Sequence, residues 1–209
     1  MKRILVAAAG GAPATNFVRS LRLTGEPYFL VGTDCDPYAL ERAETDVRLL
    51  VPKAGAPHYL AVLNQIIDEH RIEFVHIQND IELGYLSEHR EELNARLNLP
   101  SKETVAVCLD KFSSYEKWEN AGLTVPRTVY VKTEDDLRAA FEQFGPRLWI
   151  RNERGAAGRG ALPVENMDQA IAWINLQNGW GHFVAAQRLT NESVTWMSLW
   201  DTGELVVAQ

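Results

Sequence analysis

Cysteine is scarce in this sequence, and its two cysteines are far apart. Cys35 and Cys108 form no Cys-x-x-Cys motif and show no Cys/His spacing typical of a metal site. Neither a disulfide framework nor a structural zinc site is therefore indicated. Such a low cysteine content is typical of proteins that stay in a reducing compartment, so we expect a cytoplasmic protein.

Long apolar runs are also missing. An apolar run at residues 4–9 follows Met-Lys-Arg and is broken at once by Gly10 and Gly11. It is too short for the hydrophobic region of a signal peptide, and no run approaches the roughly 20 residues that cross a bilayer. We therefore expect no membrane partner.

Positive charge is not in excess. The sequence has 28 acidic and 21 basic residues, which gives a net charge of −7 at pH 7. A nucleic-acid surface needs a basic face, so we expect no nucleic-acid partner. The five histidines show no metal spacing, no Ser-His-Asp or Cys-His arrangement emerges, and no metal-ligating residue is predicted.

The first half of the sequence alternates strand and helix patterns. Apolar runs predict strands at residues 4–9, 28–33, 47–51, 74–78 and 105–109. Helical spacing predicts helices from about residue 14, at residues 59–67 and at residues 83–97. This alternation predicts an α/β fold with a Rossmann-like parallel sheet over residues 1–109, whose ligands would lie at the carboxyl ends of the strands.

Polar residues and glycines follow three of these predicted strands. They are Gly10-Gly11, Asp34 with Asp36, and Asn79-Asp80 with Glu82. Each group could contact a ligand, and each could equally form a tight turn, cap a helix or be solvated. The first turn lacks Gly-x-Gly-x-x-Gly, so an NAD(P)- or nucleotide-sugar-binding oxidoreductase is an alternative with weaker support.

The pattern changes from Asp110 onward. Asp110 can cap a helix, and Thr133 with Asp136 three residues later resembles a capping box. Strands are predicted at residues 128–131, 148–151, 161–164 and 183–189, with a helix capped by Asn166 and a hairpin turning at residues 201–203. Residues 110–209 are therefore predicted to form an α+β lobe with an antiparallel sheet.

A glycine-rich loop joins two of these strands. Gly155, Gly158 and Gly160 can adopt positive φ and let backbone N–H groups approach an anion, and Arg151, Arg154 and Arg159 add positive charge beside them. No Gly-Lys-Ser/Thr closes the loop, so it is not a P-loop. A hairpin flap over a polyphosphate is one interpretation, and a flexible turn with solvated arginines is the other.

Several segments together resemble the ATP-grasp ligases. They are Asp110-Lys111 at a helix start, residues 121–128, the strand at 148–151 with the loop at 155–160, and residues 186–189 followed by Glu192. The most similar type is that of the carbamoyl-phosphate-synthase large subunit, in which an Arg precedes the glycine loop. The resemblance implies a Rossmann-like domain at residues 1–109 followed by the N-terminal part of an ATP-grasp domain at residues 110–209.

The resemblance also implies roles for individual residues. Lys111 and Arg151 would bind the α and β phosphates of ATP, and the loop from Gly155 to Gly160 would close over the triphosphate. Residues 185–189, with Ala186, Gln187 and Leu189, would present backbone to adenine, and Glu192 would face the ribose. Gln187 departs from the Glu that many members have at this position.

Members of this family use ATP and Mg²⁺ to form an acyl phosphate from a carboxylate, which an amine then attacks. The resemblance places the Mg²⁺ ligands in a later region that this sequence does not contain, so the ATP-grasp lobe is expected to be incomplete and inactive as residues 1–209 alone. The expected partners are small-molecule carboxylates and amines, with a homodimer or a complementary subunit as further possibilities. A non-catalytic nucleotide-binding module remains an alternative.

Overall fold

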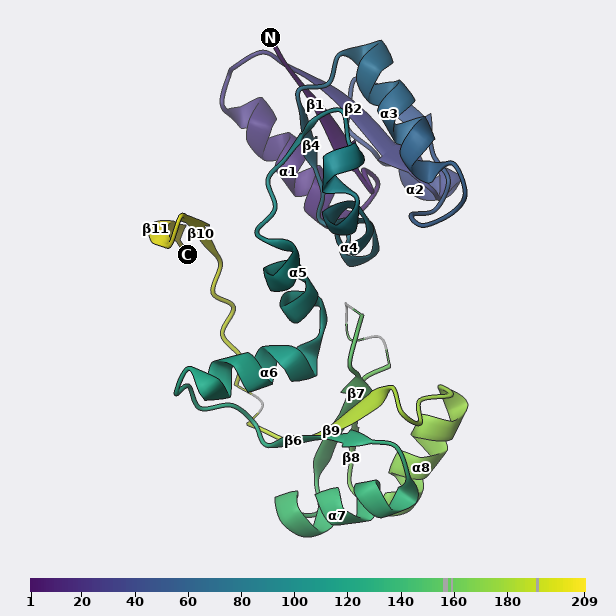
Figure 1. Cartoon of the computed structure of the whole chain (residues 1–209), viewed down its shortest axis with the longest axis vertical. Helices are drawn as coiled ribbons and strands as arrows, with labels where there is room; N and C mark the ends of the chain where they lie inside the picture. The colour runs from purple at the N-terminus through teal and green to yellow at the C-terminus, as the bar shows by residue number, and fades with distance from the viewer. Residues whose placement is uncertain (156–157, 159, 191) are drawn as a thin grey trace. The chain divides into compact units, whose positions relative to one another are not determined.

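The structure is a computed structural model that describes residues 1–155, 158, 160–190 and 192–209 (Figure 1). The chain divides into two compact units, and residues 154–157 of the glycine loop group with the first unit. Unit 1 comprises residues 1–117 and 154–157, and unit 2 comprises residues 118–153 and 158–209. The domain boundary expected between residues 109 and 110 stays a prediction.

Unit 1 is built on a parallel sheet of five strands in the order β3-β2-β1-β4-β5. The strands are β1 (Lys2–Ala7), β2 (Tyr28–Asp34), β3 (Val47–Leu50), β4 (Phe74–His76) and β5 (Arg96–Leu97). The chain runs outward from β1 to β3 and then returns to the other side of β1, which confirms the predicted Rossmann-like α/β fold.

Helices cover both faces of this sheet (Figure 1). Unit 1 contains α1 (Ala12–Leu23), α2 (Pro37–Leu40), α3 (Tyr59–His70), α4 (Asp80–Glu88), a 3-10 turn (Arg90–Glu92), α5 (Lys102–Leu109) and the start of α6 (Lys111–Asn120). Val18 of α1 belongs to a buried cluster with Val6 and Leu30 of the sheet. Side chains alternate between the two faces of a strand, so Leu5 of β1 faces α3 on the opposite side.

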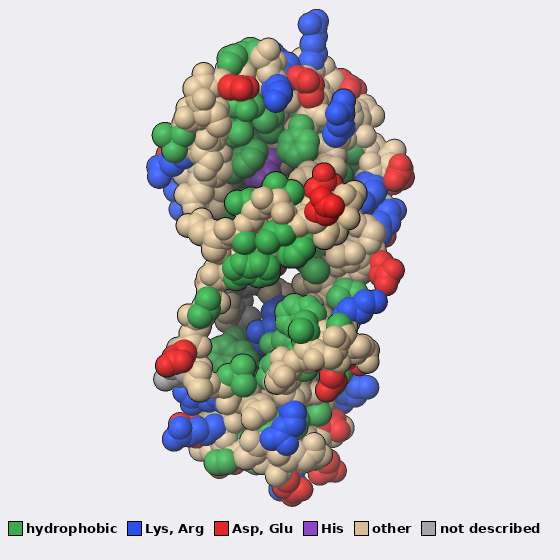
Figure 2. Space-filling model, turned by 90° about the vertical axis from the view of Figure 1, so that its left-hand side faces the viewer, with side chains coloured by type: hydrophobic (Ala, Val, Ile, Leu, Met, Phe, Trp, Pro, Cys, Tyr) green, Lys and Arg blue, Asp and Glu red, His purple; other side chains and the backbone are tan. Residues whose placement is uncertain are grey.

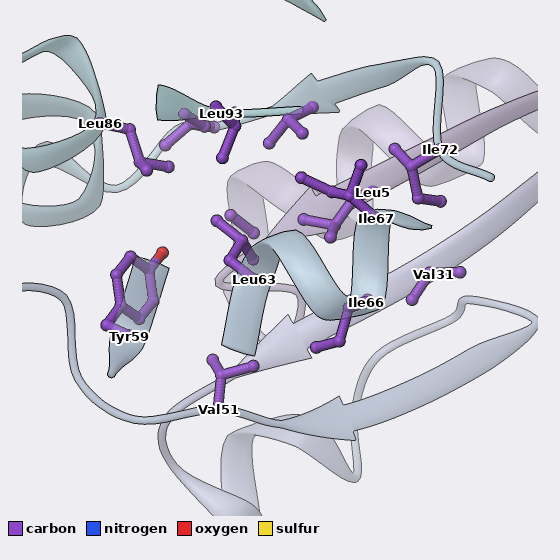
Figure 3. Packing of buried hydrophobic residues seen from close by; sticks show 13 residues of the cluster. Leu5, Val31, Val51, Tyr59, Leu63, Ile66, Ile67, Ile72, Leu86 and Leu93 are labelled. Carbon is purple, nitrogen blue, oxygen red and sulfur yellow. The ribbon is translucent and has the colours of Figure 1, made fainter. Parts of the chain in front are cut away.

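The larger core of unit 1 lies between α3 and the sheet. Figure 3 shows Leu63 and Ile67 of α3 next to Leu5, with Val31 of β2 close by. These four side chains are almost completely buried. The helical spacing of apolar residues at 59–67 therefore predicted the buried face of α3 correctly.

Two of the predicted elements in unit 1 are wrong. Residues 105–109, predicted as the fifth strand, form the end of helix α5, because the Ser101 hydroxyl accepts the Thr104 N–H and caps a helix there. The helix predicted at residues 83–97 ends at Glu88, and the true fifth strand is β5, which pairs with β4 through only two residues. So short a strand leaves almost no periodic signal in a sequence.

Unit 2 contains an antiparallel sheet of four strands in the order β6-β9-β7-β8. The strands are β6 (Thr128–Val131), β7 (Leu148–Asn152), β8 (Leu162–Val164) and β9 (Phe183–Gln187). Helices α7 (Glu134–Phe144) and α8 (Met167–Leu176) cover one face of the sheet, where Leu137 and Ile174 join its buried side chains (Figure 1). The predicted α+β lobe is confirmed.

A separate hairpin, β10 (Ser198–Asp201) and β11 (Glu204–Ala208), forms a two-stranded sheet. All of its residues are exposed, including Trp200 and Val206, and Trp196 just before it is exposed as well. Figure 2 shows that hydrophobic side chains also reach the surface on the face that it draws. No helix in the described part of the chain has both the length and the apolar character needed to cross a bilayer.

Candidate functional site

The glycine loop lies at the tip of the hairpin formed by β7 and β8. Gly155, Gly158 and Gly160 all have positive φ, at 111°, 68° and 73°. The carbonyl of Gly158 accepts the Ala161 N–H at 3.0 Å, which forms a tight turn before β8. Residues with a side chain rarely adopt these conformations, so the loop backbone requires glycine at these positions. Arg159 lies outside the described residues.

The strand ends beside the loop are anchored inside unit 2. Trp173 of α8 donates its indole N–H to the Gly160 carbonyl at 3.0 Å, and the Glu153 N–H donates to the His182 carbonyl at 3.0 Å. Arg151 lies in β7 opposite Val184 of the central strand β9 and is half-buried. The sheet therefore fixes the backbone of Arg151 at the base of the loop.

Lys111 occupies the start of α6, where the preceding residue organises the backbone. Asp110 is buried, and its Oδ1 atom accepts the N–H groups of Phe112 and Ser113, both at 3.0 Å. These bonds satisfy donors that a helix start leaves unpaired. The Nζ atom of Lys111 donates to the Gly155 carbonyl at 2.6 Å. Two residues predicted independently for the site are thus brought together within unit 1.

A second contact lies beside the first. The Nε atom of Arg154 is 3.8 Å from the Oδ2 atom of Asp110. Arg154 and Gly155 also line a pocket of about 500 Å³ together with residues of α4 and α5, among them Tyr85 and Leu109. The sequence pattern did not identify this pocket, because its walls come from segments about 25 to 70 residues apart in the chain.

The segment predicted to face adenine begins inside the sheet of unit 2. Ala186 is buried in β9 between Thr128 of β6 and Trp149 of β7, so the ladders on both sides use its backbone groups. The Gln187 N–H donates to the Arg127 carbonyl at 2.8 Å. The chain leaves the sheet only after Gln187, and the later residues are where backbone would become accessible to a ligand.

Leu189 and Glu192 follow that exit from the sheet. Both side chains are exposed, and their predicted roles stay predictions. Leu189 lines a small pocket of about 250 Å³ with Arg147 and Arg188. Both arginines are within 4 Å of the Glu165 carboxylate, at 3.7 and 3.9 Å. This cluster of opposite charges had no signal in the sequence.

Most of the polar groups at the carboxyl ends of the unit 1 strands have structural partners. Asp34 accepts the N–H groups of Gly10 and Asp36, at 3.2 and 3.0 Å. A Cβ atom on Gly10 would lie 1.9 Å from the Ala39 carbonyl oxygen, so close packing demands glycine there. Asp36 caps α2, and Asn79 caps α4. The turn and capping interpretations hold for these residues.

Glu82 was also a candidate, and it is buried against α3. Its Oε1 atom accepts the hydroxyl of Tyr59 at 2.8 Å. Burial raises the pKa of Glu82, and the Tyr59 hydrogen bond opposes that rise. Burial likewise raises the pKa of Tyr59, with the Glu82 charge adding to the effect. Asp80, in the first turn of α4, is exposed and lines the pocket shared with Arg154.

The described residues contain no ready-made metal cage. Among them, no group of three or more His, Cys, Asp or Glu side chains is placed to hold a metal ion. Magnesium usually keeps several waters and is bound through one or two carboxylates together with substrate phosphates. No step below involves a magnesium ion.

Comparison with known proteins agrees with this fold. Residues 5–97 match the family model described as "PylC-like, N-terminal domain". D-alanyl-alanine synthetase A from Vibrio cholerae has a similar structure, with a TM-score of 0.70, 17% identity, and coverage of 98% of this chain and 65% of that chain. The chain has the fold of the N-terminal part of ATP-grasp ligases.

Two further ATP-grasp structures were determined with nucleotides. Carboxyaminoimidazole ribonucleotide synthase from Aspergillus clavatus, complexed with ATP, has a TM-score of 0.64 and 16% identity over 90% of this chain and 47% of that chain. The biotin carboxylase domain dimer of 2-oxoglutarate carboxylase from Hydrogenobacter thermophilus, complexed with MgADP, has a TM-score of 0.68 and 17% identity over 91% of this chain and 45% of that chain.

The low sequence identities and the partial coverage limit the similarity to the fold. At 16 to 17% identity the similarity concerns the fold, and this chain spans about half the length of the two nucleotide complexes. The search of curated proteins gave no match.

Proposed function

We propose that this chain is the ATP-binding portion of an ATP-dependent carboxylate–amine ligase. The hydrogen bond from Lys111 Nζ to the Gly155 carbonyl, at 2.6 Å, is the observation that best supports the proposal. It joins Lys111, which we propose binds phosphate, to the first glycine of the loop that we propose covers the triphosphate. The ATP-grasp fold supports the same reading. By resemblance, the ligase would be of the carbamoyl-phosphate-synthase type.

The phosphate part of the site is assigned to cations and loop backbone. Lys111 and Arg151 bind the α and β phosphates, and the N–H groups around Gly155, Gly158 and Gly160 cover the triphosphate. An ammonium and a guanidinium make charge-assisted hydrogen bonds to phosphate, which are about twice as strong as neutral ones. Positive φ at the three glycines is a backbone conformation that anion-binding loops use. Arg159 would add a further cation.

The nucleoside part is assigned to the segment that follows β9. Residues 185–189 would present backbone to adenine, with Ala186 and Gln187 holding the segment in the sheet and Leu189 lying beyond it. Glu192 would accept hydrogen bonds from the ribose hydroxyls. The support is the exit of the chain from the sheet after Gln187, where backbone groups are no longer used by neighbouring strands.

The proposed reaction is phosphoryl transfer followed by acyl transfer. A carboxylate oxygen attacks the γ phosphorus, ADP leaves, and an amine then attacks the acyl phosphate and displaces inorganic phosphate. The protein contributes mainly positioning and charge stabilisation in such reactions. This chain would hold the triphosphate in line, with Lys111 and Arg151 offsetting the charge that builds up on ADP.

A calorimetric titration with a non-hydrolysable ATP analogue tests the assignment. Lys111→Ala and Arg151→Ala should each weaken binding by about tenfold or more, because each removes a charge-assisted hydrogen bond to phosphate. Lys117→Ala, on the same helix as Lys111, and Arg138→Ala, on α7, are exposed controls that should bind normally. Unchanged affinity in both test variants would reject the proposal.

Residues 1–209 alone are proposed to bind nucleotide without turning it over, because the resemblance places the Mg²⁺ ligands in a later region. A coupled assay for ADP release tests this, and robust Mg²⁺-dependent release would contradict it.

The proposed substrates of the whole enzyme are small-molecule carboxylates and amines. The enzyme would act as a homodimer or together with a complementary chain. Light scattering after gel filtration distinguishes a homodimer of this chain from a monomer. A cytoplasmic location fits the two exposed thiols of Cys35 and Cys108.

A further inference from the structure

Two consecutive residues at the start of α6 contact two consecutive residues of the glycine loop. Lys111 donates to the Gly155 carbonyl at 2.6 Å, and Asp110 lies 3.8 Å from the Arg154 guanidinium. All four residues belong to unit 1. We refer to Asp110, Lys111, Arg154 and Gly155 as the loop tether. The Lys111 contact was part of the proposed site, whereas the Asp110–Arg154 contact has no role in it so far.

Asp110 is the fixed end of the tether. It is buried, and one carboxylate oxygen is already held by two N–H groups of α6. The hydroxyl of Ser114 donates to the Val107 carbonyl at 2.8 Å and joins α6 to α5. The preceding residue, Leu109, is so close to α4 that a Cβ atom on Gly84 would lie 2.9 Å from it. The second carboxylate oxygen therefore faces the loop from a rigid position.

Arg154 is the movable end. Its side chain is 68% exposed, whereas that of Asp110 is 11% exposed. An ion pair of this length with one exposed partner is weak and reversible. Such a contact can break and re-form without disturbing the buried Asp110.

We propose that Asp110 and Arg154 are positioning residues of the nucleotide site, a proposal that rests on the proposed function. A phosphate oxygen is a stronger acceptor for an ammonium than a neutral carbonyl, so nucleotide binding exchanges Gly155 for phosphate at Lys111. The Lys111–Gly155 contact is then lost. The Asp110–Arg154 pair keeps the start of the loop beside Lys111, so the loop remains next to the triphosphate when nucleotide is bound.

Hydrogen exchange of the loop amides, measured without nucleotide, tests the tether. Asp110→Asn keeps an oxygen that caps α6 but removes the charge, because Asn is as good an N-cap as Asp. Arg154→Gln removes the charge from the other side. Each variant should speed exchange of residues 153–160 by about two- to fivefold, the range expected for an exposed ion pair. Because both remove the same contact, the double variant should exchange no faster than either single one.

Two controls separate positioning from general destabilisation. Arg154→Lys should retain the slow exchange, because it keeps a positive charge near Asp110. Glu44→Gln, which removes the exposed Arg19–Glu44 ion pair elsewhere in unit 1, should leave loop exchange unchanged. The affinity for the ATP analogue should fall about two- to fivefold in Asp110→Asn and Arg154→Gln, with Lys111 still present.

Three results would overturn the proposal: unchanged loop exchange in both single variants, effects that add in the double variant, or the same acceleration in Glu44→Gln. If Asp110→Asn fails to fold, Arg154→Gln alone decides, because its side chain is exposed. Failure of the tether leaves the Lys111→Ala titration intact. Failure of the ATP assignment would instead appear as absent nucleotide binding in the wild-type protein, whatever the exchange data show.

Discussion

His76 is a half-buried titratable residue at the end of β4. Its ring stacks on Phe17 of α1, with centroids 3.5 Å apart and planes 9° apart, and its Nε2 atom has no hydrogen-bond partner among the described residues. Burial lowers the pKa of His76 to about 4. The folded protein therefore holds this imidazole neutral over most of the acidic range.

The free energy of unfolding should decrease as the pH is lowered, because of His76. An unfolded histidine has a pKa of about 6.5, so between pH 6.5 and 4 the unfolded state binds the proton and the folded state does not. This contribution is fully present above pH 6.5 and is lost as the pH falls toward 4. The loss should amount to about 1 to 2 kcal/mol once partial exposure of the ring is allowed for.

Replacing this residue by His76→Phe should remove that part of the pH dependence while keeping the ring stack. Urea unfolding of unit 1 at pH 7 and pH 4.5 measures it. The variant should lose less stability than the wild type between the two values. An identical pH dependence in both proteins would mean that folding does not lower the pKa of His76.

Tyr59 and Glu82 form a buried hydrogen bond whose loss should be costly. Tyr59→Phe leaves the buried Glu82 carboxyl without its donor, so the free energy of unfolding should fall by about 1 to 3 kcal/mol. Tyr38→Phe, at a side chain that is 85% exposed, is the matched control and should change little. Urea midpoints compare the two, and equal effects would show that the hydrogen bond contributes no stability.

For helices and strands, short sequence signals predicted an element correctly where a nearby side chain satisfies the backbone N–H groups at its end. The caps at Thr133 and Asn166 formed as predicted, because a side chain three residues from the N–H it accepts needs no other part of the fold. The strand predicted at residues 105–109 is wrong, because a short apolar run has the same composition in a strand and in a buried helix. The cap at Ser101 would have distinguished them.

The capping box of α7 gives a prediction at this scale. The Thr133 hydroxyl accepts the Asp136 N–H at 3.2 Å, and the Asp136 carboxylate accepts the Thr133 N–H at 2.9 Å. Thr133→Ala should destabilise unit 2 by about 1 kcal/mol, because a helix N–H loses its partner. Glu142→Ala, at an exposed position of the same helix, is the control. Thermal unfolding followed by circular dichroism measures both, and equal melting temperatures would contradict the prediction.

The candidate site was predictable in part for the same reason. The glycines could be identified from residue type and spacing within one short segment, and Lys111 by the resemblance to ATP-grasp ligases. The two are in contact through Gly155, and their ligand roles stay predictions. The Asp110–Arg154 pair could not be identified, because 44 residues separate the two side chains and only the folded chain brings them within 3.8 Å. Asp34 was ambiguous because both a ligand and a nearby backbone N–H can satisfy a carboxylate, and here Gly10 does so.

For the whole molecule, the two units have separate hydrophobic cores. Buried clusters in unit 1 form around α3 and α1, and the cluster in unit 2 forms between its sheet and α7 with α8. A buried cluster is the main source of favourable free energy in a domain. Each unit has its own hydrophobic core, so we expect each to unfold cooperatively by itself.

This organisation predicts two unfolding transitions, each sensitive to one core. Leu63 in α3 and Leu137 in α7 are both completely buried, so Leu63→Ala and Leu137→Ala should each cost about 2 to 5 kcal/mol, but in different units. In differential scanning calorimetry, each variant should lower one transition and leave the other in place. Leu23→Ala, at an exposed position of α1, should move neither. If both core variants shift a single common transition, the units unfold as one cooperative body, and the separation of their cores has no thermodynamic consequence.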